Sequence, residues 1–221
     1  MGIPLIDELG RRIEQAWRAV ELDRARFPHL CAEELATANL PAKVDPDDVV
    51  RAALAAELPQ QADPTARFGQ PPVTIFRSRQ FYIDALFWLD ATTAIHDHGF
   101  SGAFQVLSGM SIETTYSFVP AREIGGHVRL GDLRVQSAAL RRAGDVRPIA
   151  AGPSYIHALF HLVRPSVSLV VRTFADPIPI GQFDYSPAGI AIDTFLEDPI
   201  RDRILQMIDA QRLLRGGNGF V

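Results

Sequence analysis

The stretch Ile95–Gly109, IHDHGFSGAFQVLSG, decides how the rest of the chain is interpreted. His96 and His98 are separated by a single residue. On a β-strand, alternate side chains point to the same face, whereas a helix would place them about 200° apart around its axis. Aromatic and branched residues on both sides, FYIDALFWL before the pair and AFQVL after it, favour strands. The pair therefore predicts two imidazoles that project into one interior, as two ligands of a transition metal.

A metal site needs at least a third ligand, and a second apolar segment contains two candidates. His157 and His161 lie four residues apart in SYIHALFHLVRPSVSLVVR, which spans Ser154–Arg172. On a strand, this spacing again places both side chains on one face. The residues alone leave open which of the two completes the site.

The apolar pattern changes its period along the chain. From Val73 to residue 174 it repeats every two residues, and we expect ten short strands, with turns at Ser108-Gly109 and Arg164-Pro165 among others. Before this region, and again over residues 192–214, apolar residues recur every three or four positions, as in amphipathic helices. The pattern predicts a mainly β jelly-roll barrel with three parts: an N-terminal helical extension over 1–60, the barrel over 73–176, and a C-terminal helix over 190–215 packed on the barrel.

The two histidine segments resemble the two motifs of the cupin superfamily, which form a jelly-roll barrel. In the first motif, His-x-His is followed by a glutamate. His96 and His98 match the pair, and Gly102 stands at the glutamate position. In the second motif, a Gly-Asp-Val turn precedes the third histidine, and here Gly144–Val146 and His157 match. The resemblance implies a metal held by the three histidines without the usual carboxylate.

A three-histidine site is similar to that of the thiol dioxygenase branch of the cupins, typified by cysteine dioxygenase. Pro165–Leu169 follows the third histidine as in that branch, and Arg77 is placed like its arginine for the substrate carboxylate. Val170 and Arg172 stand where the branch has a histidine and a tyrosine that relay protons. The resemblance thus implies Fe²⁺, O₂ and a small carboxylate-bearing substrate, with the metal site matching better than the thiol chemistry.

Other residues are candidates for substrate binding and acid–base work. Arg172 and Ser168 share strand parity, and an arginine inside an apolar barrel must be paired or bind an anion. A clamp on a substrate carboxylate and a salt bridge at the rim are the two alternatives for Arg172. Tyr155 shares parity with His157, so it is either an acid–base hydroxyl or part of the aromatic core. His161 is a fourth ligand, a base beside the metal, or a core histidine.

Composition narrows the classes of partner. The 221 residues include 22 basic and 26 acidic side chains, a net charge of −4, which argues against nucleic-acid binding. No apolar run approaches the roughly 20 residues that span a bilayer, and no secretory signal is recognisable. A single cysteine suits a reducing compartment. We therefore expect a soluble cytoplasmic protein with a small-molecule substrate and no membrane partner, and the terminal helices leave a homodimer open.

These observations lead to one favoured function and two alternatives. The favoured function is a mononuclear non-haem Fe²⁺ oxygenase or dioxygenase that acts on a small carboxylate-bearing substrate, such as a thiol or an amino acid. A metal enzyme without redox chemistry, an isomerase or hydrolase that uses Zn²⁺, Ni²⁺ or Mn²⁺ as a Lewis acid, is the first alternative. The second is a cupin-fold binding or regulatory module with a structural metal or none.

Overall fold

A computed structural model describes residues 3–62, 68–89, 92–174 and 181–214. The ends of the expected segments at residues 1–2, 175–176 and 215 lie outside these ranges. None of the described helices is long and apolar enough to cross a lipid bilayer. The elements in chain order are helices α1 (Pro4–Ala19), α2 (Phe27–Ala38), η1 (Leu40–Ala42) and α3 (Pro46–Leu54), strands β1 (Pro72–Arg77), β2 (Phe81–Trp88), β3 (Ile95–His98), β4 (Gly102–Ile124), β5 (Val128–Arg142), β6 (Val146–Ile149), β7 (Gly152–Thr173), β8 (Phe183–Ser186) and β9 (Ile190–Asp193), and helix α4 (Asp198–Leu214).

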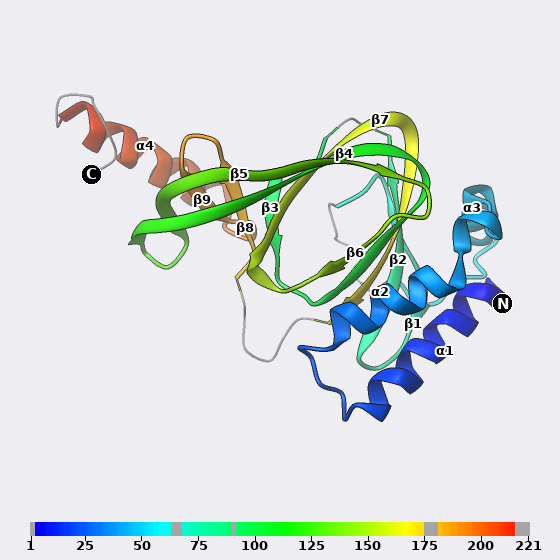
Figure 1. The fold of residues 1–221 in the computed structure, drawn as a ribbon. Coiled ribbons are helices and arrows are strands. Elements are labelled where there is room, and N and C mark those ends of the chain that lie inside the picture. The colour runs from blue at the N-terminus through cyan, green and yellow to red at the C-terminus, as the bar shows by residue number, and fades with distance from the viewer. Residues whose placement is uncertain (1–2, 63–67, 90–91, 175–180, 215–221) are drawn as a thin grey trace.

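Strand β7 joins the sheet into a closed barrel, which Figure 1 shows near the centre of the molecule. Its second half pairs with β2, its first half pairs with β3, and β4 runs antiparallel beside it from Gly102 to Tyr116. Every pairing between the named strands is antiparallel. The expected fold class, a mainly β barrel with helices before and after it, is confirmed.

Strands β4 and β7 are longer than the sequence predicted. The expected turns at Ser108-Gly109 and Arg164-Pro165 do not end a strand, because both lie within continuous strands. The pairing of β4 with β7 shifts register several times between Val106 and Ser111 and then continues, with Gly109 at a φ of 94°. Such β-bulges bend a strand without interrupting the sheet, so four expected strands are two long curved ones.

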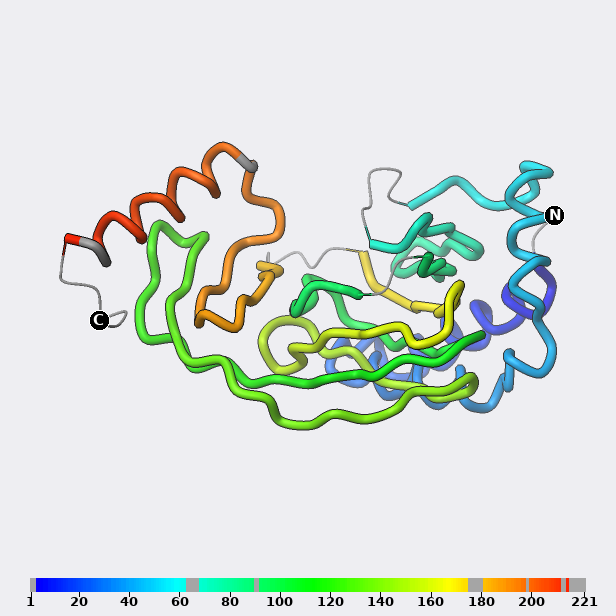
Figure 2. Tube along the Cα trace, turned by 90° about the horizontal axis from the view of Figure 1, so that it is seen from above, coloured from blue at the N-terminus to red at the C-terminus, as the bar shows by residue number. Residues whose placement is uncertain are grey.

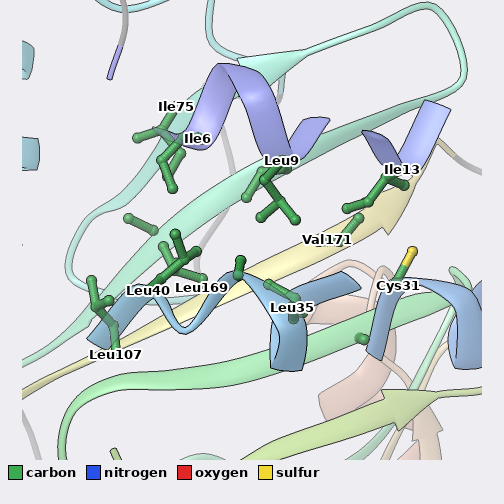
Figure 3. Close-up of a cluster of buried hydrophobic side chains, with 14 of the residues drawn as sticks. Ile6, Leu9, Ile13, Cys31, Leu35, Leu40, Ile75, Leu107, Leu169 and Val171 are labelled. Carbon is green, nitrogen blue, oxygen red and sulfur yellow. The ribbon is translucent and has the colours of Figure 1, made fainter. Parts of the chain in front are cut away.

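The N-terminal helices cover the outer face of the barrel. Apolar residues of α1 and α2 recur every three or four positions and point toward the sheet, as Figure 3 shows. They pack on the outward residues of the strands, while the alternate residues of the same strands form an inner cluster. The outer cluster includes Ile6, Leu9, Ile13, Cys31, Leu35, Leu107, Leu169 and Val171, and the inner cluster consists of Leu86, Trp88, Phe104, Val106, Ile149 and Val170.

The C-terminal region differs from the expected single helix. Ile190–Asp193 forms strand β9 and pairs with β5, so helix α4 begins only at Asp198. The hairpin of β4 and β5 extends beyond the barrel, and α4 lies beside its far end (Figures 1 and 2). The apolar side chains buried there come from the hairpin, β9 and α4, among them Val128, Leu130, Ile192, Ile204 and Ile208.

Replacement of Leu35 by alanine should lower the free energy of unfolding by about 2–5 kcal/mol, because a fully buried side chain leaves a cavity between α2 and the sheet. Leu54→Ala in α3 is the matched control. That side chain is 84% exposed, and its removal should change the free energy by less than about 0.5 kcal/mol. Urea unfolding measures both. Equal small effects would contradict the docking of α2 on the barrel.

Candidate metal centre

Three histidines converge inside the barrel. His96 and His98 lie on β3, and His157 lies on β7 directly opposite His96 in the register. All three side chains are buried, and one ring nitrogen of each lies within 4.8 Å of those of the other two. Histidine nitrogens bind metals at about 2.0–2.1 Å, so this cluster is compact enough to share one ion. The structure thus brings the three predicted ligands together.

Hydrogen bonds fix two of the three rings. His96 Nδ1 lies 2.9 Å from the carbonyl oxygen of Ala94, and His157 Nδ1 lies 3.1 Å from Glu113 Oε1. In each case Nδ1–H is the donor, which leaves Nε2 as the metal ligand, and this arrangement is usual for metal-binding histidines. His98 Nδ1 is buried and has no hydrogen-bond partner among the described residues. An orphaned buried nitrogen in this cluster fits a site that holds a ligand.

The environment keeps the rings neutral. Burial lowers the pKa of His96 from 6.5 to about 3, and repulsion from His157 adds to this effect. Burial also holds the pKa of His98 well below its usual value, with smaller contributions from its two histidine neighbours and Arg172. Neutral imidazoles have a free lone pair at physiological pH, which metal binding requires.

Glu113 is the residue that the sequence analysis missed. Its side chain is inaccessible to solvent, and its Oε1 accepts hydrogen bonds from His157 and from the Tyr155 hydroxyl. Oε2 accepts from Arg141 at 2.7 Å and lies 3.5 Å from the guanidinium of Arg147. Burial alone would raise the pKa of this carboxyl, but the hydrogen bonds from His157, Tyr155 and Arg141 outweigh it and lower the pKa to about 2. Glu113 is therefore a carboxylate.

A signal for Glu113 existed in the strand register. Glu113 pairs with Leu159 on β7, two residues from His157, so the two polar side chains share the inner face. The motif comparison searched for a carboxylate near residue 102 only. There, a Cβ on Gly102 would lie 1.8 Å from the carbonyl oxygen of Val171 on β7, so no side chain fits without a backbone shift.

Tyr155 lies beside the ligands with its hydroxyl directed away from the cavity. Its ring centroid is 4.6 Å from that of His157 and 5.7 Å from that of His98. The hydroxyl donates to Glu113, and burial together with the Glu113 charge raises its pKa. The residue predicted as an acid–base hydroxyl is thus placed as a hydrogen-bond donor behind the metal ligands.

His161 stands apart from the three-histidine cluster. Its ring stacks on Trp88 with a centroid distance of 4.9 Å, and its Nδ1 lies 2.6 Å from Ser166 Oγ. Among the described residues, the metal-binding group contains His96, His98 and His157 only. Of the three roles left open by the sequence, this geometry matches the core histidine.

A small cavity of about 60 Å³ adjoins the three histidines. Its walls are mainly apolar, and its polar groups outside the cluster lie on different elements. The lining includes Phe68, Leu86, Trp88, Phe100, Phe104, Ile149, Leu159 and Val170 as apolar walls, and Thr93, Ser168, Arg172 and Gln182 as polar groups.

Of the two arginines predicted to bind substrate, only Arg172 reaches this cavity. Its guanidinium lies 4.6 Å from the ring centroid of Phe100, and its Nη1 lies 3.7 Å from a carboxylate oxygen of Asp84. Its Nε is buried without a hydrogen-bond partner among the described residues. Arg77 lies instead on the outer surface, bonded to backbone oxygens of residues 60 and 61, because β1 carries it away from the barrel interior. Ser168 lines the cavity as predicted from its parity with Arg172.

Comparisons with known proteins agree with a barrel fold and go no further. No protein-family model and no curated protein matches the sequence. Three solved structures illustrate the neighbours. They are a hydroquinone 1,2-dioxygenase from Sphingomonas sp. TTNP3 (11% identity, 51% of this chain and 70% of that one, TM-score 0.38), an oxalate oxidase (14%, 66% and 70%, 0.35) and a cupin superfamily protein from Desulfitobacterium hafniense (16%, 54% and 95%, 0.33). At these identities and TM-scores the neighbours say nothing about the substrate.

His161 should make folding pH-dependent. Burial lowers its pKa in the folded protein from 6.5 to about 4, so between these values the unfolded chain binds the proton more readily. The stability that neutral His161 contributes is therefore lost as the pH falls from about 6.5 toward 4. Relative to His161→Gln, the wild type should lose on the order of 2 kcal/mol between pH 7 and 4.5. Urea unfolding with a chelator present measures this difference, and a pH-independent difference would contradict the assignment.

Proposed function

We propose that this protein is a mononuclear non-haem Fe²⁺ oxygenase that acts on a small substrate with a carboxylate group. The observation that supports it most directly is the set of three buried, convergent histidines beside a cavity that contains Arg172. Iron bound there would supply redox chemistry with O₂ and open positions for a chelating substrate. The remaining roles belong to the side chains of this chain.

The charge balance around the cavity favours an anionic substrate. Three neutral ligands would leave the full +2 charge of the ion, whereas a carboxylate ligand would reduce it. Arg172 adds a positive charge on the cavity wall. The nearby negative charge of Glu113 is already compensated by Arg141 at 2.7 Å. An anion with one donor for the metal and a carboxylate for Arg172 would balance these charges.

The size and polarity of the cavity limit the substrate further. A volume of about 60 Å³ has room for only a few water-sized groups, so a small thiol, amino acid or hydroxy acid fits better than an extended molecule. Arg172 and Ser168 would hold its polar end. The aromatic walls formed by Phe68, Phe100 and Phe104 would exclude water from the reacting atoms.

A metal enzyme without redox chemistry is the second candidate. Three histidines are also a ligand set of catalytic zinc, and a carboxylate behind a histidine ligand, as Glu113 is behind His157, is common at zinc sites. Zn²⁺, Ni²⁺ or Mn²⁺ would then act as a Lewis acid on the same anionic substrate. Metal identity and O₂ uptake separate the two functions.

Protein purified without a tag or chelator should contain close to one equivalent of iron. After anaerobic Fe²⁺ reconstitution, a panel of small thiols, amino acids and hydroxy acids should reveal a compound that triggers O₂ uptake at an oxygen electrode. His98→Ala should lose both iron and O₂ uptake, whereas His29→Ala, which removes an exposed histidine, should keep both. Stoichiometric zinc with no O₂ uptake would favour the Lewis-acid enzyme. No metal in the wild type would contradict both functions.

Replacement of Arg172 by glutamine should raise the KM for the active compound by about 10- to 100-fold, because a charge-assisted pair with the carboxylate is lost. Arg77→Gln is the matched control, since Arg77 lies on the outer surface and should leave the KM unchanged. Steady-state O₂ uptake measures both. The reverse pattern would assign the carboxylate to Arg77 and contradict the proposed orientation of the substrate.

A further inference from the structure

We propose that Glu113 is a positioning residue for the metal ligand His157, and that its pairing with Arg141 sets the affinity of the site for divalent metal ions. The inference rests on the metal site of the proposed function and extends it to residues outside the cavity. It concerns metal binding and does not depend on which reaction follows.

The first argument is the orientation of the His157 ring. A histidine that donates through Nδ1 to a fixed acceptor presents Nε2 to the metal and loses its rotational freedom. Glu113 Oε1 is such an acceptor, at 3.1 Å, and it is itself held by the Tyr155 hydroxyl on one side and by Arg141 on the other. The hydrogen-bonded carboxylate also increases the electron density on the imidazole, which strengthens its bond to a cation.

The second argument is the charge next to the site. Arg141 donates to Glu113 Oε2 from both Nε and Nη2 at 2.7 Å, and only 19% of its side chain is exposed. While Glu113 is ionised, its charge cancels that of Arg141 near the metal. If the carboxylate became an amide, the guanidinium would remain poorly solvated and close to a doubly charged ion. Loss of Glu113 should therefore weaken metal binding through both orientation and repulsion.

A second buried carboxylate shows that sequence proximity to the ligands is not enough. Asp97 stands between two ligands, His96 and His98, yet its carboxylate faces β8. Its Oδ1 accepts from the backbone N–H of Phe183 at 2.6 Å, and its Oδ2 accepts from the Tyr185 hydroxyl at 2.8 Å. It has no hydrogen bond to a ligand ring among the described residues. Asp97 is thus a matched control for replacing a buried carboxylate by an amide.

The test compares Co²⁺ binding by metal-free wild type, Glu113→Gln, Arg141→Gln, the double variant and Asp97→Asn. Isothermal titration and the visible absorption of bound Co²⁺ give the dissociation constants, and thermal melting of each metal-free protein gives its stability. Glu113→Gln should raise the Co²⁺ dissociation constant by about 10- to 100-fold. Adding Arg141→Gln should recover at least about threefold of this loss, because it removes the uncompensated charge.

The controls separate positioning from general damage. Arg141→Gln alone should leave the Co²⁺ dissociation constant unchanged or lower it, since the Glu113 charge then acts on the site without compensation. Asp97→Asn should lower the melting temperature and change the dissociation constant by less than about threefold. Equal effects of Asp97→Asn and Glu113→Gln, or no recovery in the double variant, would overturn the role of Glu113.

A measurement on the wild type covers the case in which Glu113→Gln does not fold. In metal-free protein labelled with ¹⁵N-histidine, NMR should show His157 as the Nδ1–H tautomer with a downfield Nδ1 proton, assigned by its absence in His157→Gln. The Nε2–H tautomer would overturn the proposal. Failure of the wild type to bind Co²⁺ would overturn the metal site itself, whereas equal affinities of wild type and Glu113→Gln would overturn only the inference about Glu113.

Discussion

The antiparallel pairing of β7 with three other strands is the constraint on which the site depends. β7 pairs with β2 and β3 along its two halves and with β4 along most of its length. A shift of one residue in this register would exchange the two faces of the strand. His157, Ser168 and Arg172 would then leave the interior, and Leu169 and Val171 would leave the contact with the helices. The outer apolar cluster that docks α1 and α2 thus also fixes which polar residues face the cavity.

The interior tolerates so many polar groups because few of them carry an uncompensated charge. Burial keeps the imidazoles of His96 and His98 neutral, and Glu113 is the ionised group closest to the ligands on the β4 side, paired with Arg141. A buried charge is stable only with a partner and hydrogen bonds, and Glu113 has both. Arg172 differs, since its closest carboxylate oxygen is 3.7 Å away and its Nε has no hydrogen-bond partner among the described residues. It is the cationic group best placed to bind an anion in the cavity.

The sequence predicted the metal ligands better than it predicted their surroundings. Alternation along a strand is a local property, so the spacing of His96 and His98 was enough to place both rings in one interior. The position of Glu113 depends on the register between β4 and β7, which contains several bulges and cannot be counted from either strand alone. Arg77 was misplaced for a related reason, because its parity does not show which face of β1 meets the interior. The strand character of Ile190 and Ile192 came from pairing with β5, which helical spacing concealed.

The walls that would select a substrate come from parts of the chain that neither histidine motif includes. Phe68 precedes β1 and packs on the His96 ring with a centroid distance of 4.9 Å. Gln182 precedes β8, lines the same cavity and accepts a hydrogen bond from the backbone of Gly99. Because Asp97 binds the neighbouring residue Phe183, the two ligands on β3 and the wall at Gln182 are held by one set of contacts. Proteins that share the histidine motifs can therefore share a metal site and still differ in substrate, since these outer segments vary independently of the motifs.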